Sequence, residues 1–271
     1  GTEVGGGVAT VDVSAATIAA QGDGSFGVSA RIVDLAGNQG ASSAALQVSV
    51  DRTAPTATAR VTAVIDDAAL YTGTIASGAR TNDTAPAVSG TVSAALAAGD
   101  AVEVLRNGAP VGLATVVGTT WSFADAGLSD ATWSYTARVV DAAGNRGNAG
   151  SAYSIVVDGT APARALAGAG IIDNVSPTLG TVRDGGSTND TRPELRLTLD
   201  SVLASGETLR IYRATGSANP VLVQQYSQRD DEFSFTDSTL ARNNTYTYSA
   251  DVVDAAGNVA RLALDYSITV I

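Results

Sequence analysis

Hydrophobic and polar residues alternate along this chain in short runs that are separated by Gly, Asn, Asp and Pro. A period of two residues predicts β-strands, and no 3.6-residue apolar stripe predicts a helix. In the middle of the chain we expect seven strands, at residues 56–64, 87–92, 101–106, 111–117, 121–124, 135–140 and 153–157. Seven strands in about 100 residues are typical of an immunoglobulin-like sandwich. The pattern therefore predicts an all-β fold built from such sandwiches.

The alternation is clearest in the strand at residues 135–140 and in a later copy of it. The side chains expected to face the core are Tyr135, Ala137 and Val139, and in the later copy Tyr248, Ala250 and Val252. A tyrosine at the start of this strand is typical of the tyrosine corner of sandwich domains. The pair Asn107-Gly108 predicts a type I′ hairpin, because both residues tolerate a positive φ.

Three motifs recur along the chain and show that it is a tandem array. Val-Asp-(Leu/Ala)-Ala-Gly-Asn stands at residues 33–38, 140–145 and 253–258; Val-Asp-x-Thr-Ala-Pro at 50–55 and 157–162; and Thr-Asn-Asp-Thr-x-Pro at 81–86 and 188–193. Asp51 and Asp158 give a repeat length of 107 residues (158 − 51), whereas Asp141 and Asp254 are 113 apart (254 − 141). The six extra residues fall partly in a longer hairpin at 213–220, as insertions usually lie in turns.

The repeats divide the chain into three parts. We expect the C-terminal half of an immunoglobulin-like repeat at residues 1–51 and complete β-sandwich repeats at 52–158 and 159–271, joined in a linear rod. The first part lacks a counterpart of residues 56–100, and three strands cannot bury two faces. It is therefore truncated, partly disordered, or completed by another chain.

Composition excludes several classes of function. The net charge of −11, a pI near 4.3 and 16 basic residues that are all Arg argue against nucleic-acid binding. The absence of Cys and His removes thiolate chemistry and the usual general base. No apolar run reaches the 18 to 20 or so residues that a membrane helix needs. We therefore expect a monomer that does not insert into a membrane and is not an enzyme.

Strand parity places the acidic residues at the two ends of each sandwich. If successive strands alternate in direction, the turn at residues 141–145 lies beside the linker Asp51 and the loop near Asp100. Residues 66–83 then lie at the opposite end. In a head-to-tail array we expect Asp66, Asp67 and Asp83 to converge on Asp158, Asp254 and Asn258 of the next joint.

Several carboxylates close together repel one another, and a hard cation that takes six to eight oxygen ligands offsets this repulsion. The sequence therefore predicts Ca²⁺ at the joints, with Mg²⁺ less suited to loop ligands. The candidate ligands are Asp51, Asp66, Asp67, Asp83, Asp100, Asp141, Asn145, Asp158, Asp173, Asp190, Asp254 and Asn258. The alternative for each of them is a purely local role, because Asp and Asn also stabilise turns by hydrogen bonding to nearby backbone.

These motifs resemble the bacterial Ig-like repeats of giant biofilm-associated and type I-secreted surface adhesins. The matching features are Val-Asp-x-Thr-Ala-Pro, the acidic pair Asp66-Asp67 (Asp173-Asn174 in the last repeat) followed by Gly-Thr-(Ile/Val), Thr-Asn-Asp-Thr-x-Pro and Asp-Ala-Ala-Gly-Asn. The resemblance covers residues 51–271 and part of the first fifty. It implies a secreted protein of the bacterial cell surface, with calcium between neighbouring repeats and a role in attachment or biofilm formation. Asn174 departs from the pattern and weakens one expected ligand.

The rival hypothesis is a module that binds a host or matrix glycan or protein. The third repeat would be the binder, because its hairpin at 213–220 and its Gln224-Gln225-Tyr226 run differ from the middle repeat. Trp121 and Trp133 could form a sugar-stacking pair, although tryptophans in strands more often pack in a core. Asp230, Asp231 and Glu232 could supply a hydrolytic pair, but nothing in the sequence indicates a cleft around them.

Overall fold

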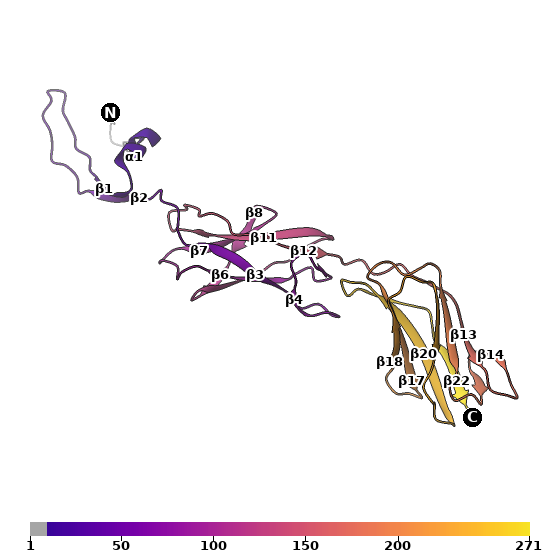
Figure 1. The fold of residues 1–271 in the computed structure, drawn as a ribbon. Helices are drawn as coiled ribbons and strands as arrows, with labels where there is room; N and C mark the ends of the chain where they lie inside the picture. Colours follow the sequence, from indigo (N-terminus) through magenta and orange to yellow (C-terminus); the bar gives the residue numbers. More distant parts are fainter. Residues whose placement is uncertain (1–9) are drawn as a thin grey trace. The chain divides into compact units, whose positions relative to one another are not determined.

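The computed structural model describes residues 10–271. They form one short helix, α1 (Ala15–Gln21), and 22 strands, so this part of the chain is almost entirely β (Figure 1). The described chain divides into two compact units, one of residues 10–62, 89–123 and 134–153 and another of residues 63–88, 124–133 and 154–271. This division cuts the middle repeat, so the predicted domain boundaries after Asp51 and Asp158 stay a prediction.

The first segment forms a single hairpin. Strands β1 (Gly24–Val28) and β2 (Leu46–Val50) pair antiparallel in a two-stranded sheet. Helix α1 begins after Ser14, whose hydroxyl accepts the N–H of Thr17, and it buries none of its residues. The prediction of no helix is wrong here, because the alanine-rich run has a high helix propensity and no sheet partner.

The middle repeat consists of two five-stranded sheets. Its strands are β3 (Ala59–Asp66), β4 (Gly73–Ile75), β5 (Arg80–Thr81), β6 (Ala87–Val92), β7 (Ala101–Arg106), β8 (Ala109–Leu113), β9 (Thr115–Val117), β10 (Thr120–Ala124), β11 (Ala131–Val140) and β12 (Tyr153–Val157). The sheet orders are β4-β3-β6-β10-β9 and β5-β12-β11-β7-β8. The predicted strands at 87–92, 101–106 and 153–157 have the observed bounds.

Two differences from the predicted strands share one cause. The expected strand at 111–117 is two strands, because β8 pairs with β7 and β9 pairs with β10 of the other sheet. The unpredicted strands β4 and β5 divide in the same way: β4 pairs with β3, and β5 pairs in parallel with β12 of the other sheet. A segment that pairs first with one sheet and then with the other has too few residues in each sheet to show an alternation of apolar and polar side chains.

The third repeat has the same order of strands, except that it lacks a counterpart of the edge strand β9 and adds a short strand beside the long one. Its strands are β13 (Leu166–Asp173), β14 (Gly180–Val182), β15 (Gly186–Thr188), β16 (Glu194–Leu199), β17 (Thr208–Thr215), β18 (Val221–Tyr226), β19 (Glu232–Thr236), β20 (Asn244–Val253), β21 (Val259–Arg261) and β22 (Tyr266–Val270). The sheet orders are β14-β13-β16-β19 and β15-β22-β20-β17-β18, with β21 paired to β20. Tandem immunoglobulin-like sandwiches are thus the architecture, as the sequence predicted.

The predicted core positions are buried. Tyr135, Ala137 and Val139 of β11 are each 0% exposed, and Tyr248, Ala250 and Val252 of β20 are at most 4% exposed. Trp121 of β10 is 2% exposed, so it belongs to the core and cannot stack on a sugar. Asn107 and Gly108 have φ values of 50° and 80°, which confirms the predicted hairpin turn.

The tyrosine corner is formed by a different residue from the one expected. The hydroxyl of Tyr246 accepts the N–H of Ala241 at 2.9 Å and donates to its carbonyl at 3.1 Å. Tyr248 instead donates to the buried carboxylate of Asp237 at 2.6 Å. Both residues face the core because they are two positions apart on β20.

Candidate functional site: the linker joints

Each Asp-(Leu/Ala)-Ala-Gly-Asn motif closes a tight turn on its own aspartate. Oδ1 of Asp141 accepts the N–H groups of Ala143 and Asn145 at 2.9 and 2.8 Å, and Oδ2 accepts Nδ2 of Asn145 at 2.9 Å. Asp254 and Asn258 make the same contacts, as do Asp34 and Asn38. Gly144 and Gly257, with φ of 92° and 99°, allow the chain to turn. These carboxylates thus serve the local turn.

The asparagine that ends the turn also holds the linker. Nδ2 of Asn145 donates to the carbonyl oxygen of Asp51 at 3.1 Å, and Nδ2 of Asn258 donates to that of Asp158 at 2.7 Å. Strand parity predicted that the turn lies beside the incoming linker, and these contacts confirm it. We call this contact the downstream anchor.

An aspartate in the preceding part of the chain holds the other end of each linker. Asp23 accepts the hydroxyl of Thr53 at 2.6 Å and Nε of Arg52 at 2.9 Å. Asp130 accepts the hydroxyl of Thr160 at 2.6 Å and the N–H of Gly159 at 2.8 Å. The threonine hydroxyls lower the pKa of both carboxyls from 3.8. We call this contact the upstream anchor.

The upstream anchor was missed in the sequence. Asp23 and Asp130 lie outside the conspicuous motifs, in the short stretch before β1 and β11. The available signal was that the pairs Asp23/Thr53 and Asp130/Thr160 recur at the spacing of the repeat. In both copies, the partner of the linker threonine is an aspartate at the same spacing.

The linker aspartates use their carboxylates locally. Oδ1 of Asp51 accepts the N–H of Thr53 at 3.0 Å, and Oδ1 of Asp158 accepts that of Thr160 at 3.3 Å. Oδ2 of Asp158 also pairs with Arg80 at 3.0 Å. These bonds shape the start of the linker before the Thr-Ala-Pro stretch, where proline favours extended backbone.

At the other end of each repeat, two buried aspartates share one threonine. Asp66 and Asp83 are 5% and 4% exposed, and Asp66 accepts the hydroxyl of Thr81 at 2.5 Å while the N–H of Asp83 donates to the same hydroxyl at 2.9 Å. The exposed Asp67 contributes its N–H to Asp83 at 3.2 Å. The third repeat repeats the arrangement with Asp173, Asp190 and Thr188. Sequence motif and geometry therefore recur together.

An asparagine beside each buried pair has an oxygen without a partner. Nδ2 of Asn82 donates to the carbonyl of Ala69 at 2.9 Å, and Nδ2 of Asn189 donates to that of Ser176 at 2.9 Å. The Oδ1 atoms of both side chains are buried and accept no hydrogen bond within the part of the chain that the structure describes. A buried polar atom left in this way requires an explanation.

The loop that carries Asn82 contacts the turn of the next repeat. The N–H of Asn82 donates to the carbonyl of Ala256 at 3.2 Å. A Cβ added at Gly257 would lie 3.2 Å from the ring of Tyr71 and 3.4 Å from the backbone of Leu70. The predicted neighbours therefore meet through backbone atoms and the side chains of Tyr71 and Asn82.

The predicted convergence of carboxylates is not formed. Within residues 10–271, no group of three or more acidic side chains lies close enough to hold a metal ion. Asp100 lies in a loop in which a Cβ at the adjacent Gly99 would approach Ala142 to 2.8 Å, so that loop does adjoin the turn at Asp141. Its counterpart in the third repeat, Glu207, instead pairs with Arg164 at 2.7 Å.

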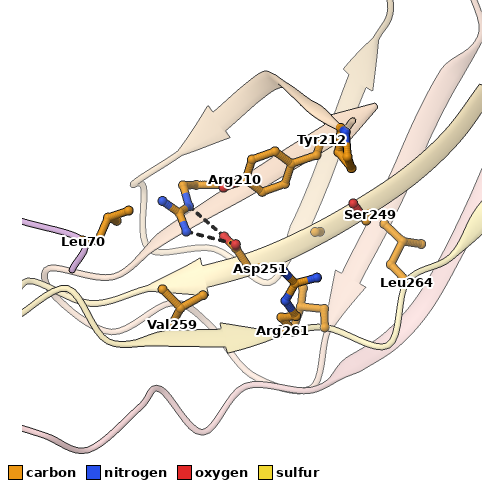
Figure 2. Close-up of a pocket in the computed structure, with 11 residues that line it drawn as sticks. Leu70, Arg210, Tyr212, Ser249, Asp251, Val259, Arg261 and Leu264 are labelled. Carbon is orange, nitrogen blue, oxygen red and sulfur yellow. Dashed lines mark hydrogen bonds and ion pairs between the residues drawn. The ribbon is translucent and has the colours of Figure 1, made fainter. Parts of the chain in front are cut away.

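The third repeat has a hollow on its six-stranded sheet. Arg210 of β17 and Asp251 of β20 are joined there by bonds of 2.7 and 2.9 Å, with Tyr212, Ser249 and Arg261 also lining it (Figure 2). The middle repeat has Glu103 and Arg138 at the equivalent positions, 2.6 Å apart. This pair is therefore a brace between strands in both repeats, with the charges reversed.

Residues 58–159 match the family model of the bacterial Ig-like domain. The middle repeat therefore resembles a bacterial Ig-like domain. The third repeat has the same motifs and lies outside the matched residues. The search of curated proteins finds no match to this chain.

Several solved structures are similar to the chain. The fibronectin(III)-like modules of CbhA from Clostridium thermocellum are 13% identical, over 76% of this chain and 93% of theirs, with a TM-score of 0.41. The FN1–FN3 domains of chicken CNTN1 are 12% identical over 89% and 76%, with a TM-score of 0.43. The BSP domain of a biofilm associated protein is 20% identical over 72% of this chain and 28% of that one, with a TM-score of 0.23.

The described residues contain no helix with the length and apolar character needed to cross a membrane.

Proposed function

We propose that the chain is a spacer segment of a secreted bacterial surface adhesin, in which calcium stiffens the joints between repeats and the array serves attachment or biofilm formation. The observation that carries the proposal is the doubly anchored linker. The same upstream and downstream anchors occur at Asp51 and at Asp158, one repeat length apart. The partners of each repeat are then its neighbours in the same protein.

A linker held at both ends has little freedom. In the second joint, Gly159 and Thr160 bond to the preceding repeat, and the carbonyl of Asp158 bonds to the following repeat. The first joint has one bond of each kind as well. Few residues remain between the anchors, and proline restricts those that follow. This favours a fixed angle between neighbouring repeats, as a spacer requires.

The buried aspartate pairs fit a calcium ion in part. Asp66 and Asp83 together with Oδ1 of Asn82, and Asp173 and Asp190 with Oδ1 of Asn189, offer carboxylate and amide oxygens of the type that calcium takes. A bound cation would offset the repulsion within each pair and give the buried amide oxygen a partner. Asp141, Asp158 and Asp254 are not in this set, because they are only half-buried and no asparagine with a buried, unpartnered oxygen stands next to them in the sequence.

Small-angle scattering of the full chain with calcium and with a chelator tests the proposal. We expect a longer maximum dimension with calcium and a broader distribution of dimensions with chelator. Paired Asn82→Ala and Asn189→Ala substitutions should reduce the number of calcium ions seen by native mass spectrometry. Unchanged scattering together with no bound calcium would contradict the metal part of the proposal.

Variants of the downstream anchor separate the hydrogen-bonded joint from the metal. Asn145→Ala and Asn258→Ala should broaden the scattering distribution even when calcium is present. Asn38→Ala is the matched control, because its turn is the same while its contacts include no linker carbonyl. A rigid array in the Asn145→Ala and Asn258→Ala variants would show that the anchors do not fix the joint.

The rival hypothesis, a glycan- or protein-binding third repeat, is supported by the hollow around Tyr212. A glycan array probed with the full chain and with a Tyr212→Ala variant distinguishes the two. Reproducible hits that the variant loses would favour the rival, and the absence of hits would favour the spacer.

A further inference from the structure

The outer face of the six-stranded sheet in the third repeat carries three charged residues in one row. Asp251 of β20 stands opposite Arg210 of β17 on one side and opposite Arg261 of β21 on the other. Figure 2 shows the two guanidinium groups on either side of the Asp251 carboxylate. Arg210 forms two bonds to that carboxylate, whereas Arg261 forms no ion pair within residues 10–271. One positive charge of the row is therefore left without a partner.

The middle repeat uses its arginines differently at this place in the sheet. There Glu103 pairs with Arg138 at 2.6 Å and with Arg146 at 3.4 Å, so two arginines share one carboxylate. The chain has 27 acidic residues and 16 basic ones, so Arg261 is not unpaired because carboxylates are scarce. A free guanidinium is available to a carboxylate from outside the chain, which its planar fork binds through two parallel hydrogen bonds.

The hollow beside Arg261 has the size and lining of a site for a small ligand. Its volume is about 560 Å³, and ligand sites measure roughly 300 to 1,000 Å³. Tyr212, Pro220 and Leu264 contribute apolar surface to it. Sites for small ligands combine apolar and aromatic walls with a few polar groups that fix the orientation of the ligand. Arg261 is such a polar group.

The features that build the hollow are the ones in which the third repeat differs from the middle one. Tyr212 stands where the middle repeat has Leu105, which is only 5% exposed. Arg261 lies on β21, where the middle repeat has a single bridge instead of a strand. Pro220 ends the longer hairpin at 213–220. A spacer needs repeats that are alike, so differences gathered in one place indicate a role beyond spacing.

The polar groups around Arg261 match a ligand that carries hydroxyl groups as well as a carboxylate. Ser249 stands opposite Tyr212 across the two strands, and its hydroxyl makes no bond to the described part of the chain. The two oxygens of Asp251 accept one bond each from Arg210 and have room for further donors. An acidic sugar supplies a carboxylate and hydroxyl donors on one ring, whereas an acidic amino-acid side chain supplies its carboxylate alone.

Arg210 holds the neighbouring side chains in place before any ligand arrives. Its guanidinium carbon lies 5.7 Å from the centre of the Tyr212 ring, a distance at which a cation and an aromatic ring attract each other. Burial, together with the charge of Asp251, raises the pKa of Tyr212, so its hydroxyl stays protonated and remains a donor. A site whose groups are already held needs little ordering on binding.

We propose that this hollow binds a uronic acid unit of an acidic polysaccharide. Arg261 holds the sugar carboxylate, the ring of Tyr212 packs against the sugar ring, and Asp251 and Ser249 bond to its hydroxyl groups. Arg210 is a positioning residue, because it holds both Asp251 and Tyr212. This inference goes beyond the spacer function, gives the rival hypothesis a defined class of ligand, and does not depend on calcium.

Titration of the full chain with a tetramer of galacturonic acid, in the presence of a chelator, tests the proposal. The chelator prevents calcium from bridging the sugar to carboxylates of the protein, and it separates this test from that of the stiffened joints. The methyl ester of the same tetramer keeps the rings and removes the charge, so we expect it to bind about tenfold or more weakly. Equal affinity for both forms, or no binding of the acid form, would overturn the proposal.

The variant Arg261→Gln assigns the binding to the hollow. Because Arg261 is exposed and forms no ion pair within the described residues, the substitution should leave the fold intact. We expect it to weaken binding of the acid tetramer by about tenfold or more and to leave binding of the ester unchanged. The matched control is Arg60→Gln, because Arg60 is also exposed and unpaired there but does not line the hollow.

Two further outcomes would overturn the proposal. An equal loss of affinity in Arg261→Gln and Arg60→Gln would mean that the sugar responds to the net charge of the chain rather than to this site. A tetramer of glutamate that binds as tightly as the sugar, and that loses affinity in Arg261→Gln, would assign the hollow to an acidic polypeptide.

Discussion

The middle and third repeats share a strand order but differ in the side chains that brace it. Glu103 pairs with Arg138 in the middle repeat, and Arg210 pairs with Asp251 in the third, so the charges are reversed at equivalent positions of adjacent strands. The two strands attract each other through opposite charges in both repeats, although the residue at each position differs. Arg210 and Asp251 therefore act as a structural pair between two strands.

The corner residue differs in the same manner. Tyr246 bonds both backbone groups of Ala241, whereas the equivalent Trp133 donates its indole N–H to the carbonyl of Ser129 at 3.0 Å. Either ring ties the start of the long strand to the preceding loop. The comparison teaches that the repeats preserve contacts rather than residue types.

The largest effect should come from charging the core of one repeat. Val139→Asp and Val252→Asp each place a carboxylate at a position that is 0% exposed, which should cost about 4 kcal/mol or more. Both tryptophans lie in the middle repeat, so urea unfolding followed by tryptophan fluorescence should lose its transition only in Val139→Asp. Ile32→Asp, at a residue that is 83% exposed, is the control and should change little. Equal shifts for Val139→Asp and Val252→Asp would mean that the two repeats unfold together.

The next largest effect should come from the brace. Arg210→Glu sets two carboxylates together where the side chains are only 13% and 12% exposed, and should destabilise the third repeat by about 3 kcal/mol. The double variant Arg210→Glu with Asp251→Arg copies the orientation of the middle repeat and should regain most of this loss. Hydrogen exchange in β20 measures both. Arg196→Ala, which breaks an exposed pair with Glu194, should cost less than about 1 kcal/mol.

A smaller effect should follow removal of the buried hydroxyl of Tyr248. Burial, together with the bond to Asp237, raises the pKa of Tyr248, so the hydroxyl remains a donor at all ordinary pH values. Tyr248→Phe leaves the Asp237 carboxylate, which is 2% exposed, with one bond fewer and should cost about 1 to 3 kcal/mol. Tyr246→Phe, at the corner, should cost about 1 kcal/mol. A thermal unfolding curve that ranks the two the other way would locate the main restraint at the corner.

The smallest effect should be the pH dependence of the middle brace. Burial alone would raise the pKa of Glu103, but hydrogen bonds from Arg138 and Arg146 outweigh it and the pKa lies below 4.5. A lowered folded-state pKa means that this stabilisation is complete above about pH 4.5 and is lost as the pH falls through the folded value. The urea midpoint reported by tryptophan should therefore fall in that range. Glu103→Gln should make the fall shallower, and an unchanged slope would assign it to other carboxylates.

Period and spacing were sufficient to predict the sandwiches. Tyr135, Val139 and Val252 could be assigned to the core because alternation along a strand fixes which side chains share a face. The hairpin at Asn107 was predictable because few residues accept a positive φ. The helix at Ala15 was not, since the equivalent positions in the middle repeat belong to strand β10.

The joints were predicted in position but not in detail. Strand parity placed Asn145 and Asn258 next to the linkers, and it placed the loop with Asn82 next to the following turn. Parity says nothing about where a side chain points, so the carboxylates of Asp141 and Asp254 were expected to face a cation and instead cap their own turns. The calcium site remains a prediction, now restricted to the buried pairs beside Asn82 and Asn189.

The short parallel pairing of β5 with β12 has a mechanical consequence. The linker leaves the middle repeat directly from β12, where the N–H groups of Val156 and Asp158 donate to Ala79 and Thr81, each at 2.9 Å. Because β5 belongs to the start of the repeat and β12 to its end, tension applied along the chain pulls these two parallel strands in opposite directions. Their hydrogen bonds are then loaded in shear and must break together, whereas strands that are peeled apart lose their bonds one at a time.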